Sequence, residues 1–252
     1  MGNLVWIGFI AFFIVALVVG VRVLLLARRS RELPELLMGV GVLGIGPVGF
    51  GLMVVARQFE GSSPEFHTLL LGVSLFAVGC GAFAQFVFNW RVYHPGSGIA
   101  RALALLAGAG LFGTFVWAGL AHGFIAEDPT APHSLIRSLL QISCLLWGAG
   151  ESFAYWTKMR RRVRLGLADP VVSNRFLMWA IGAFAAGWGT AVGLAGQIIT
   201  GAPTTEANWV LVSSSMHGLV AAIAIALAFI PPGFYLRYIR TRAERSNADA
   251  TT

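Results

Sequence analysis

Polar residues recur at helical spacing through an apolar segment at residues 134–156. Steps of three or four residues separate the members of this set, which are His133, Arg137, Gln141, Cys144, Gly148, Glu151 and Tyr155. Such spacing places them on one face of an α-helix. A polar side chain is costly in hydrocarbon and normally points inward. We therefore expect an interior polar track made of His133, Arg137, Gln141, Glu151 and Tyr155, which would either conduct protons or ions or hold two separate ion pairs.

The two charged members of the track need partners of their own. Arg137 and Glu151 would lie about 21 Å apart along a helix, too far to pair with each other. The partners expected for Arg137 are the acidic residues of connections on its side of the membrane, Glu60, Glu65, Glu127, Asp128 and Glu206. Those expected for Glu151 are Asn89, Arg91 and Arg175.

Four of the five histidines fall in the outer half or the midplane of predicted membrane spans. They are His67, His122, His133 and His217. If three or four of these imidazoles converge, they would bind copper, another transition metal or haem. Each histidine comes from a different span, so hydrogen-bonded packing residues are the alternative.

His217 is the deepest histidine, and Ser213 precedes it by one helical step. The tryptophans Trp147, Trp179 and Trp188 also lie away from span ends. A pocket walled by these rings and closed by His217 and Ser213 would suit an extended apolar ligand. Ordinary core packing explains the tryptophans about as well.

Seven long apolar segments position these residues, and they predict an all-α fold, a bundle of seven transmembrane helices in a single domain. Each segment is near the roughly 20 residues that cross the hydrocarbon of a bilayer. The expected spans are 4–26, 35–56, 67–90, 99–121, 134–156, 174–199 and 206–236, followed by a short polar tail at 237–252.

The basic residues predict the orientation of the bundle. Of the 18 Lys and Arg residues, all but Arg57 and Arg137 fall in alternate connections, at the end of the chain or, for Arg22, within reach of the same side. The positive-inside rule then places the N-terminus outside and the C-terminus in the cytoplasm. Because the cations are dispersed beside helix ends, we expect contact with the lipid bilayer and not with nucleic acid. The densest cluster would bind an anionic lipid or a cytoplasmic protein: Lys158, Arg160, Arg161, Arg162 and Arg164.

The layout resembles the microbial rhodopsins, with seven spans in 252 residues, tryptophans in the sixth span and a titratable group at mid-depth in the seventh. That family attaches retinal to a lysine of the seventh span. Here His217 takes that depth, and Lys158, the only lysine, lies in a connection. The third span offers Gln85 and Asn89 where the family carries carboxylates. Covalent retinal is therefore excluded, whereas haem, copper or a non-covalent apolar chromophore remain open as cofactors.

The end of the last span, Phe229 to Arg237, is similar to the exit of membrane sensor regions in bacterial signalling proteins. We therefore expect a receptor-like or sensory protein of a bacterial cytoplasmic membrane, which holds a small apolar ligand or relays a conformational change to a cytoplasmic partner. A membrane redox protein that binds haem or copper, and a proton or ion pathway, are the alternatives. No predicted span carries an aspartate, and no serine nucleophile motif is present, which argues against an enzyme.

Overall fold

A computed structural model describes the chain except for residues 1, 60, 62, 125–129, 202–207 and 249–252. Its elements, in order, are α1 (Gly2–Ser30), α2 (Leu33–Leu43), the π-helical turn η1 (Gly44–Phe50), α3 (Gly51–Ala56), the 3-10 turn η2 (Arg57–Phe59), α4 (Pro64–Tyr93), α5 (Gly98–His122), α6 (Pro132–Arg164), α7 (Pro170–Thr200), α8 (Asn208–Phe229) and α9 (Gly233–Ala248). The described residues contain no strand, so the predicted all-α class is confirmed.

Local sequence sets where several of these helices begin and end. The Asp169 carboxylate accepts a hydrogen bond from the Val171 backbone N–H at 2.8 Å and so caps α7, whose first residue is a proline. Proline suits this position because its fixed φ is already helical and its missing N–H has no partner there anyway. Gly123 and Gly201 end α5 and α7 with φ values of 57° and 64°, a left-handed conformation that glycine adopts without steric cost.

Six helical stretches are long and apolar enough to cross a membrane, which makes the chain an integral membrane protein. They are Trp6–Ser30, Leu33–Phe59, Pro64–Tyr93, Gly98–His122, Pro170–Thr200 and Trp209–Phe229. Helix α6, the longest at 33 residues, is not among them. Its apolar run is interrupted by Arg137, Gln141 and Glu151, the same residues that predicted the polar track.

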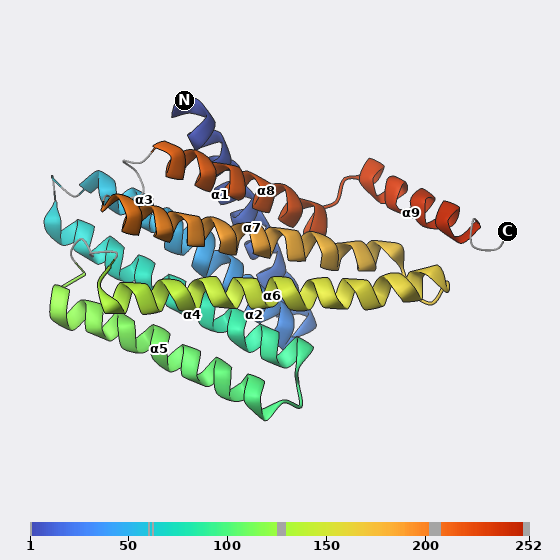
Figure 1. The fold of residues 1–252 in the computed structure, drawn as a ribbon, viewed down its shortest axis with the longest axis horizontal. Coiled ribbons are helices and arrows are strands. Elements are labelled where there is room, and N and C mark those ends of the chain that lie inside the picture. Colours follow the sequence, from blue (N-terminus) through green and yellow to red (C-terminus); the bar gives the residue numbers. More distant parts are fainter. Residues whose placement is uncertain (1, 60, 62, 125–129, 202–207, 249–252) are drawn as a thin grey trace.

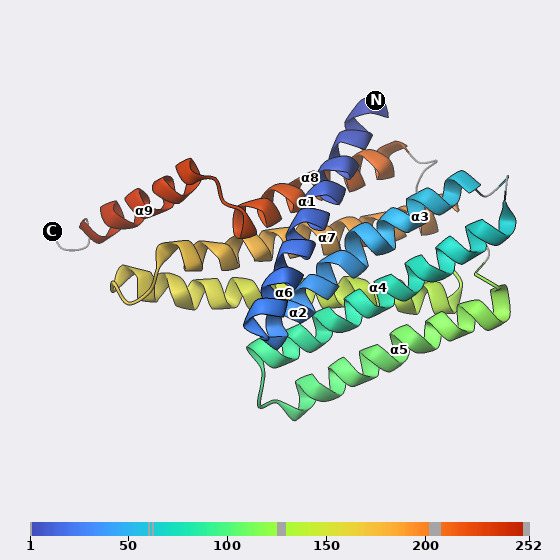
Figure 2. The ribbon, with the colours of Figure 1, turned by 180° about the vertical axis from the view of Figure 1, so that it is seen from behind.

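The long helices pack into one elongated bundle (Figures 1 and 2). Helix α6 lies among α4, α5 and α7, while α8 packs between α7 and α1, and α1 also contacts α2. The α1–α2, α4–α5 and α6–α7 connections lie at the end of the bundle from which α9 projects, which we call the α9 end. Residues of α4 and α6 near their α9 ends are thereby brought together.

The second apolar stretch contains a π-helical turn around Pro47. A proline removes one backbone donor and crowds the preceding turn, which disturbs the ordinary helical hydrogen bonds. The Ser74 hydroxyl donates to the Gly49 carbonyl at 2.7 Å and so pairs α4 with this turn. Gly44 also approaches α4 closely, since a Cβ there would lie 2.8 Å from the Gly81 Cα. The glycines of this segment therefore serve close helix packing.

The last predicted span, 206–236, is wrong at its end. Helix α8 stops at Phe229, and Gly233–Ala248 forms the separate helix α9. Pro231 and Pro232 explain the break, because neither can donate a backbone hydrogen bond and each disfavours a helical residue before it. Much of the predicted polar tail therefore belongs to a second helix, whose Ile239 is buried against the bundle.

Candidate functional site

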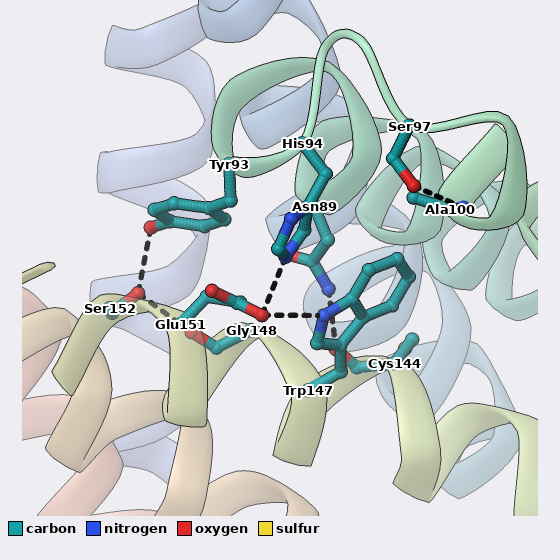
Figure 3. Close-up of polar contacts among 10 residues, drawn as sticks. All are labelled: Asn89, Tyr93, His94, Ser97, Ala100, Cys144, Trp147, Gly148, Glu151 and Ser152. Carbon is teal, nitrogen blue, oxygen red and sulfur yellow. Dashed lines mark hydrogen bonds and ion pairs between the residues drawn. The ribbon is translucent and has the colours of Figure 1, made fainter. Parts of the chain in front are cut away.

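A group of hydrogen-bonded polar side chains joins the end of α4 to α6 (Figure 3). His94, the residue after α4, places its Nε2 at 2.7 Å from the Glu151 Oε1. The same oxygen accepts a hydrogen bond from the Trp147 Nε1 at 3.1 Å, and the His94 and Trp147 rings are stacked. The His94 and Glu151 side chains are 38% and 26% exposed, so water reaches this contact from the α9 end.

Beside this contact, a hydrogen-bonded chain links Tyr93 to α6. The Ser152 hydroxyl donates to the Gly148 carbonyl at 2.7 Å. Its oxygen lies 2.8 Å from the Tyr93 hydroxyl, which must therefore be the donor in that contact. Ser152 is fully buried, so this chain satisfies polar groups that would otherwise lack partners.

Deeper in the bundle, two buried amides complete the contact between α4 and α6. The Asn89 Nδ2 donates to the Cys144 carbonyl at 3.0 Å, and the Gln85 Nε2 donates to the Asn89 Oδ1 at 3.1 Å. Gly148 leaves the room for them, because a Cβ there would lie 3.1 Å from both the Asn89 Oδ1 and the Gln85 Nε2. We call the whole group the α4–α6 polar cluster; its members are Gln85, Asn89, Tyr93, His94, Trp147, Glu151 and Ser152.

The opposite end of α6 carries a second polar group. His133 is buried, and its ring stacks on that of His122 with centroids 4.8 Å apart. The Trp117 ring is tilted by 41° against the His133 ring, with centroids 5.5 Å apart. Arg137 is also buried, one turn further along α6. His67 lies buried on α4, and His217 lies on α8. Among the described residues, no three or more His, Cys, Asp or Glu side chains gather as a metal site would require.

An apolar core lies where α4, α5 and α6 pack together. Phe86, Leu111 and Leu145 are buried there together with Ala82, Ala104, Ala107 and Cys144, from helices α4, α5 and α6. Gln141 is only half-buried, and Tyr155 is 39% exposed beyond the α4–α6 polar cluster. The residues of the predicted polar track therefore differ in burial: His133 and Arg137 are buried, whereas Tyr155 is exposed.

The tryptophans of the predicted pocket lie in different surroundings. Trp147 belongs to the α4–α6 polar cluster, whereas Trp179 is buried with Val19, Val23 and Ile225. Trp188 is 48% exposed and stacks on Phe184. Phe184, the stacking partner of Trp188, lines the groove that also contains His217.

His217 lines a groove of about 220 Å³ between α7 and α8. The other lining residues are Ile181, Phe184, Ala185, Met216 and Val220. The His217 Nδ1 lies 2.7 Å from the carbonyl oxygen of Ser213, and the Ser213 hydroxyl is 3.4 Å from the same nitrogen. Ser213 thus contacts His217 within α8 but does not itself line the groove, whose other walls are aliphatic side chains and one phenylalanine.

The expected partners of the charged track residues are partly corrected. Glu151 pairs with His94, whereas Asn89 bonds to Cys144 and the Arg91 guanidinium lies over the Trp90 ring. Of the acids expected near Arg137, Glu65 is exposed, and Glu60, Glu127, Asp128 and Glu206 lie outside the described residues.

Three residues that sequence reasoning did not place in a site are Tyr93, His94 and Ser152. A signal for them exists. Gln85, Asn89 and Tyr93 recur every four residues and so share one face of α4. Helical spacing on a neighbouring span would have pointed to the partner of the α6 stripe.

Comparison with models of protein families, with curated proteins and with solved structures gave no match. The function is therefore argued from the side chains and their geometry.

Proposed function

We propose that the chain is a sensory, receptor-like membrane protein that passes a conformational change from the lipid-embedded part of α7 and α8 to α9. In this proposal α6 also crosses the membrane, which brings the number of crossing helices to seven. Its polar face is turned into the bundle. The seven helices then have the rhodopsin-like layout, with the N-terminus outside and α9 in the cytoplasm of a bacterial cell. The basic residues at the α9 end support this orientation.

The observation that carries the proposal is the continuity of one helix pair. Helices α7 and α8 flank the His217 groove. Helix α9 follows α8 in the chain and packs against α7 and α6. Tyr235 of α9 and Asn174 of α7 are joined by a hydrogen bond of 3.0 Å from the Asn174 Nδ2 to the Tyr235 hydroxyl. A small apolar ligand that moves α7 against α8 would therefore also move the support of α9.

In this movement α4 and α6 would stay fixed relative to each other, since the hydrogen bonds of the α4–α6 polar cluster join the two helices at several positions along their length. The cytoplasmic partner would bind α9 together with the exposed basic end of α6. That end contains Lys158, Arg160, Arg161, Arg162 and Arg164.

A bulky side chain placed in the groove tests whether a change there is passed on to α9, which we call the relay. This test does not require the ligand to be known. Spin labels at Leu167 in the α6–α7 turn and at Thr241 in α9, both exposed, report the distance between these elements, with Cys80 and Cys144 replaced by alanine. Val220→Trp places a ring in the groove, and we expect it to shift the distance distribution measured by pulsed electron resonance in nanodiscs.

Ile223→Trp is the matched control, because Ile223 is exposed on the same helix and does not line the groove. The relay requires a shift in Val220→Trp and none in Ile223→Trp. Identical distributions in the two variants would contradict it.

A further inference from the structure

The groove between α7 and α8 has one polar side chain and otherwise apolar walls. Phe184, Met216 and Val220 are 52%, 49% and 44% exposed, on helices that are apolar enough to lie in lipid. A cavity of about 150 Å³ holds one benzene ring. A groove of about 220 Å³ therefore has room for a single substituted ring, and an attached chain would continue along the helices in the hydrocarbon.

The position of His217 in this groove is fixed by its neighbours. A Cβ at Gly189 would lie 2.8 Å from the His217 Cβ, so the glycine lets α7 and α8 approach at this level. On the other side, the ring is bonded back to the Ser213 carbonyl one turn earlier. The imidazole is thus held against the helix surface near the middle of α8.

These contacts determine which nitrogen carries a proton. A carbonyl oxygen only accepts hydrogen bonds, so the Nδ1 at 2.7 Å from the Ser213 oxygen must be the N–H donor. Helices α1, α7 and α8 contain no acidic residue that could pair with an imidazolium. With Nδ1 as the donor, Nε2 is the ring atom left to accept a hydrogen bond, and it has no partner among the described residues.

We propose that the groove binds a lipophilic molecule whose ring carries a hydroxyl group, and that this hydroxyl donates a hydrogen bond to the His217 Nε2. Alkylated phenols and quinols have this chemistry. The biological role of this ligand rests on the proposed sensory function, but its binding to the groove does not depend on the relay to α9.

Two photoreactive probes that differ by one donor test the assignment. They are 4-dodecylphenol with a diazirine in its alkyl chain and the corresponding methyl ether, which has the same shape but cannot donate. With the full chain in phosphatidylcholine nanodiscs, mass spectrometry gives the probe concentration for half-maximal labelling of α7 and α8 peptides. We expect it to be about fivefold lower for the phenol, the effect of one neutral hydrogen bond.

His217→Leu should raise the phenol concentration to that of the ether and leave the ether unchanged, which also shows that the groove still forms. His122→Leu, a histidine outside the groove, should preserve the preference for the phenol. Equal values for the two probes in the unmodified protein, a preference that survives in His217→Leu, or no saturable labelling by either probe would each overturn the assignment. If the phenol is preferred but leaves the distance between Leu167 and Thr241 unchanged, the relay fails and the ligand assignment stands.

Discussion

At the scale of single residues, Gly148 decides whether the α4–α6 polar cluster forms. Gly148→Ala would place a methyl group against the two buried amides, Gln85 and Asn89, with 3.1 Å contacts to both. We expect a loss of about 1–3 kcal/mol in the free energy of unfolding, measured by SDS titration in mixed micelles. Gly150→Ala is the control, since nothing lies within 4 Å of its Cβ position. Equal stability of the two variants would contradict this role of Gly148.

Glu151 is the acceptor shared by His94 and Trp147 at the α9 end of the same cluster. Glu151→Ala removes the acceptor for both, and we expect a loss of about 1 kcal/mol, because the contact is partly exposed to water. Glu151→Gln retains one acceptor oxygen and should lose less. The same unfolding measurement compares the three proteins, and a Gln variant as unstable as the Ala variant would speak against hydrogen bonding as the cause.

Helical spacing in the sequence predicted which residues share a face of α6, but it did not predict that Glu151 pairs with His94 and Trp147. Helical spacing determines which residues share a face, so the alignment of His133, Arg137 and Glu151 follows from position alone. The pairing of Glu151 with His94 depends instead on where α4 ends and how it is rotated against α6. Neither quantity can be calculated from the spacing within one span. The Ser213–His217 contact was predictable because both residues lie on one helix.

At the scale of elements, hydropathy located the long helices, and proline chemistry explains the main error. The predicted last span ran through Ile230, Pro231 and Pro232 because its apolar character continues there, whereas the backbone hydrogen bonds do not. The same hydropathy explains why α6, interrupted by polar residues, is the one long bundle helix outside the six apolar stretches. A helix whose polar face points into a protein needs less apolar surface than one that faces lipid on all sides.

Helix α9 should depend on Tyr235 for its position. Tyr235→Phe removes the hydroxyl that accepts from Asn174, and we expect the distance distribution between labels at Leu167 and Thr241 to broaden. Tyr238→Phe serves as the control, because Tyr238 is 58% exposed and its hydroxyl accepts a hydrogen bond of 3.5 Å from Arg242 on its own helix. A distribution that stays equally narrow in both variants would show that other contacts position α9.

At the scale of the whole molecule, the account depends on how many helices cross the membrane. Six stretches qualify by length and apolar character, and six crossings would leave both ends of the chain on one side. The proposed function requires that α6 also crosses the membrane. Only then does the groove between α7 and α8 lie within the membrane while the α4–α6 polar cluster and α9 lie toward the cytoplasm. The charge distribution favours the seventh crossing, because it collects nearly all cations on one side.

The sides on which the two chain ends lie test this claim most directly. A short epitope tag at the N-terminus and another at the C-terminus can be detected with antibodies in intact and in permeabilised bacterial spheroplasts. We predict that the N-terminal tag is accessible in intact spheroplasts and that the C-terminal tag is accessible only after permeabilisation. Detection of both tags on the same side would mean an even number of crossings, and would contradict the placement of α6 across the membrane.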